Sequence, residues 1–157
     1  MVTAHLPPSV TLRPAQAGDE PVLYAIHRAA MREVVTQAYG AWDEEFQRRY
    51  LHEHMGDRPI EIVCEEGRPV GLLSVIERED ELVLASIELA PEAQNRGIGG
   101  VLVRSVLERG RAAGKPVALR DLKANRAVAL YTRLGFRVVA DDAGYCYLRS
   151  EVAPASP

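Results

Sequence analysis

A glycine-rich turn between an apolar run and a helical pattern is the feature that most constrains this chain. The apolar run covers residues 82–89, and the turn reads Gln-Asn-Arg-Gly-Ile-Gly-Gly over residues 94–100. A turn that leads into a helix in this way presents unpaired backbone N–H groups and the positive end of the helix dipole. Gly97 and Gly99 allow the backbone to approach a ligand closely, and Arg96 adds a positive charge. The turn therefore predicts a phosphate or pyrophosphate site.

Three alternative interpretations of the glycine-rich turn fit the sequence less well. An ordinary turn with a glycine near a helix start needs no ligand. A nucleotide P-loop requires Gly-Lys-Ser/Thr, which is absent here. A dinucleotide fingerprint would need a third glycine where Leu102 stands and would open a parallel βαβ unit. Asp121 follows about 20 residues later, as in that fingerprint, so this alternative remains.

Composition limits the class of protein. The chain has 157 residues, 47% of them hydrophobic, and this length suits one domain with one core. Its formal net charge is -3, so it lacks the excess of basic residues that binds nucleic acid. No apolar run approaches the ~20 residues of a membrane span, and residues 1–10 lack the features of a secretory signal. Cys64 and Cys146 are too far apart for a disulfide framework or zinc knuckle, and His52 and His54 lie on different helix faces. We expect a cytoplasmic protein without a metal, a membrane or a nucleic-acid partner.

Hydrophobic periodicity predicts an α/β (α+β mixed) fold, with a mixed, mostly antiparallel sheet of about seven strands flanked by about four helices. The connections between the three strands that precede the turn are too short for crossover helices, so these strands form an antiparallel meander. One crossover follows in the middle of the chain. The domain spans residues 10–150, between flexible termini 1–9 and 151–157. The expected strands are 10–13, 60–64, 70–76, 82–89, 116–120, 136–140 and 144–148, and the expected helices are 20–38, 42–55, 97–112 and a short one capped by Asn125.

Two spaced motifs resemble those of a known superfamily. Gln94-x-x-Gly97-x-Gly99, after a strand that ends in Glu-Leu-Ala-Pro at residues 88–91, resembles the acyl-CoA pyrophosphate loop of the GNAT superfamily of N-acetyltransferases. The segment Asn-x-Ala-x-x-Leu-Tyr-x-x-Leu-Gly-Phe at residues 125–136 is similar to a second signature of that superfamily. The expected order of elements matches it over nearly the whole chain.

The resemblance implies acetyl-CoA as co-substrate and a set of groups that hold it. The backbone amides of the turn would hold the pyrophosphate, assisted by the Arg96 charge. The strand before the turn would splay from its neighbour and offer the amides of Ile87 and Leu89 to the pantetheine and the thioester carbonyl. Asn125 would serve as helix cap and contact the cofactor arm. The full set of expected cofactor-binding residues is Ile87, Leu89, Gln94, Asn95, Arg96, Gly97, Ile98, Gly99, Gly100 and Asn125.

Two residues are candidates for catalysis. Tyr131 matches the general acid of the family, and its ordinary pKa of ~10 exceeds that of a thiol, ~8.5; the alternative is a core tyrosine whose hydroxyl bonds to a backbone carbonyl. Glu88 alternates with Ile87 and Leu89, so it points to the opposite face, where the acceptor amine of such proteins often lies. There it would take a proton directly or through water, or attract an ammonium; the alternative is a solvated surface glutamate.

The leading hypothesis is an N-acetyltransferase that moves the acetyl group directly to a primary amine, with no covalent enzyme intermediate and no metal. A non-catalytic acyl-CoA-binding sensor or interaction module is the alternative, and a nucleotide-dependent oxidoreductase is a third possibility. The acceptor is a small-molecule or peptide amine, and the protein a monomer or homodimer. His27 has no partner pattern and is expected to be non-catalytic, whereas Tyr145 or Tyr147 is a candidate lining residue of the acceptor pocket.

Overall fold

Seven strands form one sheet in the computed structural model, which describes residues 6–152. Their order across the sheet is β1-β2-β3-β4-β5-β7-β6. Residues 1–5 and 153–157, parts of the termini expected to be flexible, lie outside the described residues. The strands are β1 (Val10–Pro14), β2 (Glu61–Glu65), β3 (Arg68–Glu77), β4 (Leu82–Leu89), β5 (Val117–Leu122), β6 (Arg137–Asp141) and β7 (Tyr145–Arg149), and the helices are α1 (Glu20–Tyr39), α2 (Glu44–Asp57), α3 (Ile98–Ala113) and α4 (Ala127–Arg133), with 3-10 turns η1 (Ala17–Asp19) and η2 (Pro91–Ala93).

The sheet is antiparallel except at one pair of strands. β4 and β5 are parallel and are joined by the crossover helix α3, and every other neighbouring pair is antiparallel. The mixed, mostly antiparallel sheet expected from the sequence is therefore confirmed. The parallel sheet that a dinucleotide-binding fold requires is not present in residues 6–152.

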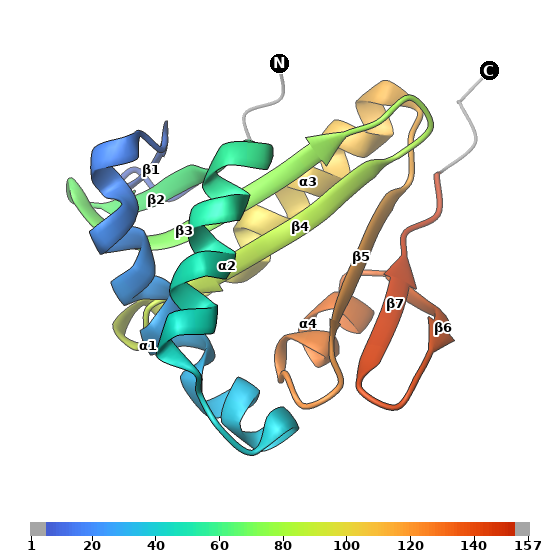
Figure 1. Cartoon of the computed structure of the whole chain (residues 1–157). Helices are drawn as coiled ribbons and strands as arrows, with labels where there is room; N and C mark the ends of the chain where they lie inside the picture. The colour runs from blue at the N-terminus through green and yellow to red at the C-terminus, as the bar shows by residue number, and fades with distance from the viewer. Residues whose placement is uncertain (1–5, 153–157) are drawn as a thin grey trace.

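The parallel pair opens almost as soon as it forms. Only Leu82 with Val117 and Val83 with Ala118 are paired, and beyond them β4 and β5 diverge (Figure 1). The β3–β4 register shifts at Ser74 and Val75, where β4 carries one extra residue, Ala85. A bulge of this kind bends a strand and increases its twist. The second half of β4 thus has an open edge.

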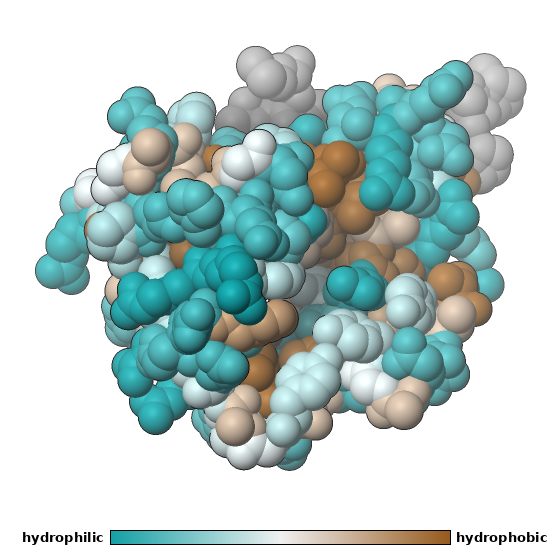
Figure 2. Space-filling view, viewed as in Figure 1, coloured by the Kyte–Doolittle hydropathy of each residue, from teal (hydrophilic) through white to brown (hydrophobic). Residues whose placement is uncertain are grey.

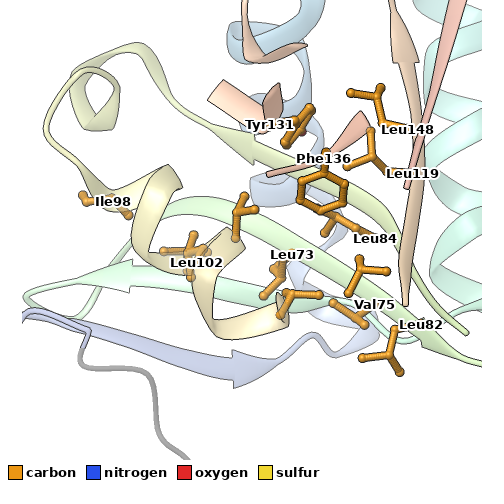
Figure 3. Packing of buried hydrophobic residues seen from close by; sticks show 14 of the residues in the cluster. Leu73, Val75, Leu82, Leu84, Ile98, Leu102, Leu119, Tyr131, Phe136 and Leu148 are labelled. Carbon is orange, nitrogen blue, oxygen red and sulfur yellow. The ribbon is translucent and has the colours of Figure 1, made fainter. Parts of the chain in front are cut away.

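The helices cover the two faces of the sheet and bury two apolar clusters. Helices α1 and α2 lie on one face and α3 on the other, with α4 below the divergent end of β5 (Figure 1). The cluster on the α1 side is Leu23, Tyr24, Ile26, Leu51, Ile62, Cys64 and Leu72. The other cluster joins α3 and α4 to the sheet and includes Leu73, Leu82, Leu102, Leu119, Tyr131, Phe136 and Leu148 (Figure 3).

The start of α2 differs from the expected start at residue 42. Asp43 has an extended backbone, and its carboxylate accepts a hydrogen bond from the Phe46 N–H at 3.0 Å. This is an N-cap, and it fixes the first helical residue as Glu44. Trp42 lies outside the helix and packs against the α1-side cluster.

The end of α4 agrees with the sequence expectation. Gly135 has a φ of 103°, and the Phe136 N–H donates to the Tyr131 carbonyl at 3.1 Å. This left-handed turn brings Phe136, which is 2% exposed, back against the Tyr131 ring at a centroid distance of 5.8 Å. The turn therefore fixes where the Tyr131 side chain lies (Figure 3).

Replacing Gly110 with alanine is expected to destabilise the protein by about 1–3 kcal/mol. A Cβ at Gly110 would lie 2.7 Å from the Lys115 carbonyl oxygen and 3.0 Å from Val117 Cγ2, so α3 would have to move away from β5. Thermal unfolding measures the loss. Gly56→Ala in α2 is the matched control, because nothing lies within 4 Å of its added Cβ. Equal melting temperatures for the two variants would contradict the prediction.

Candidate active site

The glycine-rich turn leaves its backbone N–H groups free. None of the amide nitrogens of residues 95–100 donates a hydrogen bond to another described residue; the next amide, of Val101, donates to the Gly97 carbonyl at 3.1 Å. Positive φ angles of 59° at Asn95 and 84° at Gly97 create the tight turn before α3. The N-terminus of a 16-residue helix follows directly. The turn therefore has the geometry that the sequence predicted for an anion site.

The open edge of β4 leads to this turn. The Ala90 N–H donates to the Val70 carbonyl of β3 at 2.8 Å. Because N–H directions alternate along a strand, the N–H groups of Ile87 and Leu89 point away from β3, toward the open edge. The Gln94 side-chain amide donates to the Leu89 carbonyl at 2.8 Å. Gln94 therefore ties the turn to the end of β4, and the two expected amides face the gap.

The turn also has space that the protein does not fill. A Cβ added to Gly99 would make only ordinary contacts, 3.6 Å from Leu89 Cδ1 and 3.8 Å from Leu130 Cδ2. Packing within the protein therefore does not require glycine at this position. The space between β4 and α4 and the free N–H groups suit a narrow, anionic ligand such as the diphosphate arm of a coenzyme.

The positive charges near the turn are not distributed as expected. The Arg96 guanidinium binds the Glu65 carboxylate of β2 through two contacts of 2.6 and 2.8 Å. The Arg104 guanidinium lies against the turn instead, 3.5 Å from the position of a Cβ on Gly100. Arg104 forms no ion pair within residues 6–152, and sequence reasoning missed it. Its position one helical turn after Gly100 is the signal that indicates it.

A cavity of about 860 Å³ lies between α1, α2 and the diverging strands. Figure 2 shows it as a hollow in the middle of this face. Glu88, Asp121, Asn125 and Tyr131 all line it, so the cavity reaches both expected catalytic residues. Tyr145 lines it too, as the sequence suggested.

Glu88 is not a solvated surface residue. Its side chain is 11% exposed, and both carboxylate oxygens lie within 3.0 Å of His27 Nδ1. The other ring nitrogen, Nε2, is 2.8 Å from Gln47 Oε1. With an acceptor at each nitrogen, the imidazole is arranged to carry two protons. Although burial lowers the pKa of His27, Glu88 and the hydrogen bond to Gln47 raise it more, so its pKa lies above the ordinary value.

The pairing of His27 with Glu88 was not expected from the sequence. The two residues are separated by 61 positions, and no spacing rule connects them. Glu88 itself points where alternation placed it, because Ile87 and Leu89 pack against the opposite, α3-side cluster. The partner depends on how α1 docks on the sheet.

Tyr131 is buried and faces the same gap. It is 3% exposed, and its hydroxyl makes no hydrogen bond to another described residue, so the backbone-carbonyl alternative is not observed. Burial raises the pKa of Tyr131, and the Asp121 and Glu88 carboxylates raise it further. The phenol is therefore fully protonated at neutral pH.

Asp121 and Asn125 form a bonded pair beside Tyr131. Asn125 donates from its amide to Asp121 at 3.2 Å and accepts from the Ala127 N–H at 3.0 Å. The N-cap residue of α4 is Arg126 rather than the expected Asn125, which binds the first helical N–H from one residue earlier. Burial raises the pKa of Asp121 to about 6, against hydrogen bonds from Asn125 and the Leu122 N–H that lower it. Asp121 is thus an acidic residue of this site, whereas its sequence position had suggested a dinucleotide ligand.

The described residues were searched for a metal site and for a membrane-spanning helix. No group of three or more His, Cys, Asp or Glu side chains in residues 6–152 is placed to hold a metal ion. Over the same residues, no helix has the length and apolar character needed to cross a membrane.

Comparison with solved structures identifies the same architecture. PaiA N-acetyltransferase from Thermoplasma acidophilum, solved with coenzyme A, matches 91% of this chain and 99% of its own at a TM-score of 0.72 and 16% identity. The ribosomal-protein-S18-alanine N-acetyltransferase of Escherichia coli matches 94% and 96% at 0.69 and 20% identity. YncA of Salmonella typhimurium, solved with its cofactor acetyl-CoA, matches 95% and 97% at 0.59 and 17% identity. At these identities the likeness shows the fold.

A match to a protein-family sequence model shows the family of this chain. Residues 23–136 match the model of the acetyltransferase (GNAT) family. The match extends from α1 to the residue that ends the α4 turn, so it includes the glycine-rich turn, Glu88 and Tyr131. This chain is a member of the GNAT family of acetyltransferases.

Proposed function

We propose that residues 10–150 form an N-acetyltransferase domain that transfers the acetyl group of acetyl-CoA directly to a primary amine. The observation that carries this proposal is the open edge of β4. It runs from the free N–H groups of the glycine-rich turn to a cavity lined by Glu88 and Tyr131. The GNAT family match and the coenzyme A and acetyl-CoA complexes of similar folds support it.

The chain offers a continuous set of groups to the coenzyme. The N–H groups of residues 95–100 would bind the diphosphate, and those of Ile87 and Leu89 the pantetheine arm and thioester carbonyl. Gln94 holds the turn in place through Leu89. Arg104 is the better placed cation, because Glu65 already neutralises Arg96.

Acetyl-CoA, when bound, supplies a thioester whose carbonyl carbon forms a bond to the amine nitrogen while the carbon–sulfur bond breaks. An ammonium cannot attack, so the amine must first lose a proton. Glu88 lines the cavity and has two acceptor oxygens for that proton, directly or through one water. His27 is a positioning residue, since its Nδ1–H orients the carboxylate and its charge balances it.

Tyr131 is the proposed source of the proton for the departing thiolate. Its hydroxyl is protonated at neutral pH, and the carboxylates of Asp121 and Glu88 that raise its pKa disfavour a lasting phenolate. Asn125 fixes Asp121 and the start of α4, so it supports this position.

Tyr131→Phe is expected to lower kcat about 100-fold while changing the affinity for acetyl-CoA less than about 3-fold. Phenylalanine keeps the edge contact with Phe136 and removes only the hydroxyl. Steady-state kinetics and a binding titration separate the two effects. Tyr147→Phe is the control, because its hydroxyl bonds to Asp142 on the last hairpin. An unchanged kcat would remove the acid role from Tyr131.

Calorimetric titration with acetyl-CoA, followed by a thiol-release assay over a panel of primary amines, tests the function. We expect saturable binding and acetylation of at least one amine, verified by product mass. Binding without transfer to any amine would favour the acyl-CoA sensor or interaction module. Binding of neither acetyl-CoA nor coenzyme A would overturn the proposal.

A further inference from the structure

The acceptor side of the cavity contains one arginine whose charge is not balanced. Arg58 donates to Asp57 at 3.1 Å, and Arg78 lies 3.6 Å from Glu81. Arg120 also lines the cavity, but it has no carboxylate within ion-pair distance in residues 6–152. An unbalanced guanidinium offers a planar set of donors that matches a carboxylate.

The exposed side chain of Arg120 packs on an aromatic ring. Its Cζ lies 4.9 Å from the centroid of the Tyr145 ring, within the range of a cation–π contact. The Tyr145 hydroxyl accepts a hydrogen bond from the Tyr39 hydroxyl at 2.9 Å, across 106 positions of sequence. This bond joins the end of α1 to β7, so the platform beneath Arg120 is fixed from both sides of the cavity.

Carboxylates line the same cavity as Arg120. Two of them are Asp121 and Glu88, the second of which is paired with the His27 imidazole. Burial raises the pKa of Tyr50, Glu88 raises it further, and Arg58 and Arg120 lower it, so the Tyr50 phenol lies in the field of both signs. An acceptor that contacts Tyr50 in this cavity therefore has both the Glu88 carboxylate and the Arg120 guanidinium around it.

Much of the remaining cavity wall is apolar. It consists of aliphatic side chains of α1, β3 and β4 and aromatic rings of α2 and β7: Met31, Val35, Ile76, Val83, Phe46, Tyr50 and Tyr145. Such a wall buries an apolar or aromatic group of a small molecule. A free polyamine has no large apolar group to bury against this wall, and Arg120 repels its second ammonium.

We propose that the acceptor is a free amino carboxylic acid with an apolar or aromatic side chain, whose carboxylate binds Arg120 while its amine faces Glu88. The proposal rests on the acetyltransferase function proposed above and names its substrate class. A peptide N-terminus lacks a carboxylate next to its amine, so it does not satisfy both Arg120 and Glu88. The covalent step is the one already described, in which the amine nitrogen replaces the thiol at the acetyl carbon.

Matched acceptors test the proposal. At fixed acetyl-CoA, kcat/KM is measured for L-phenylalanine, L-leucine and L-methionine, for their primary amides, for phenethylamine and for spermidine. We expect kcat/KM for each amino acid to exceed that for its amide by about 10-fold or more, because the amide loses the hydrogen-bonded charge pair with Arg120. Amides, phenethylamine or spermidine used as well as the amino acids would overturn the proposal.

The arginine is tested on the same substrates. Arg120→Gln is expected to raise KM for L-phenylalanine about 10- to 100-fold and to leave its amide unaffected, and Arg120→Lys to lose less. Arg137→Gln, which removes a surface arginine paired with Glu151, is the control. An equal loss for acid and amide, with acetyl-CoA affinity retained, would refute the role of Arg120. If the protein acetylates none of these acceptors, the result would instead contradict the acetyltransferase function.

Discussion

Glu88→Gln is expected to lower kcat for acetyl transfer by about 100- to 1,000-fold, with acetyl-CoA affinity unchanged. The amide keeps the shape of the carboxylate and its place beside His27 but cannot take a proton from an ammonium. The proposed coenzyme-binding groups on β4 and in the turn are backbone atoms, which the substitution does not alter. Steady-state kinetics and calorimetric titration measure the two quantities independently.

His27→Gln tests positioning separately. Without the imidazole, Glu88 keeps its charge but loses the donor that orients it, so we expect a loss of kcat about 10-fold, smaller than that of Glu88→Gln. Its profile of kcat against pH should also shift, because the substitution removes the charge of His27 from the groups around Glu88. The other charged groups there are Asp121 and Arg120, and the phenols of Tyr50 and Tyr131 are neutral. A purely structural role would leave the shape of that profile unchanged.

Stability against pH gives a second test of the same pair. Because the folded pKa of His27 is raised above 6.5, the stabilisation by the pair is complete below that pH and is lost as the pH rises through the raised pKa. Glu88→Gln removes the charge that raises the pKa of His27 most, and leaves burial, which lowers that pKa, opposed by the hydrogen bond to Gln47. The stabilisation at low pH is therefore smaller in the variant. The melting temperature of the wild type should therefore be higher than that of the variant, and this difference should be larger at about pH 5.5 than at about pH 9.

The exposed Glu79→Gln substitution in the β3–β4 turn is the control for both measurements. It should match the wild type in kcat and in melting temperature at each pH. A kcat of Glu88→Gln within about 3-fold of the wild type would show that the amine loses its proton elsewhere.

Gly99→Ala is expected to weaken acetyl-CoA binding by about 10- to 100-fold without destabilising the protein. The added methyl makes only ordinary contacts with Leu89 and Leu130, and alanine favours a helix more than glycine does. In the proposed binding mode, the methyl would occupy the space that the diphosphate and its hydrogen bonds need. Calorimetry measures the affinity, and thermal unfolding without ligand measures the stability.

Gly56→Ala is the matched control for that experiment. It makes the same chemical change in α2, with open space around the added Cβ. Both variants should keep or slightly raise the melting temperature, and only Gly99→Ala should lose affinity. An unaltered affinity in Gly99→Ala would show that the coenzyme does not approach this part of the turn.

Much of the fold and part of the site could be predicted from local sequence. Short connections forced the antiparallel meander, and the single long connection through α3 gave the parallel pair. The turn at residues 94–100 and the cap at Gly135 depend on backbone preferences of neighbouring residues, so their geometry was predictable. Strand alternation placed Glu88 on the face opposite Ile87 because side chains of a strand alternate strictly.

The charge partners could not be predicted in this way. Arg96 adjoins the turn in sequence, yet a guanidinium on a long, flexible side chain bonds to the nearest carboxylate in space, which is Glu65 on β2. Arg104 reaches the turn because the helix returns its side chain toward Gly100 after one turn. Sequence distance was therefore a poor guide to which cation, among the described residues, is free beside the glycine-rich turn.

The sequence by itself determined the order of elements, the free N–H groups of the glycine-rich turn and the directions of Glu88 and Tyr131, because each follows from bonds and torsions within a few residues. Only the tertiary structure decided the divergence of β4 from β5, the pairing of His27 with Glu88 and the contact of Arg120 with the Tyr145 ring. These contacts join residues on separate elements, and they exist only once the helices have packed on the sheet.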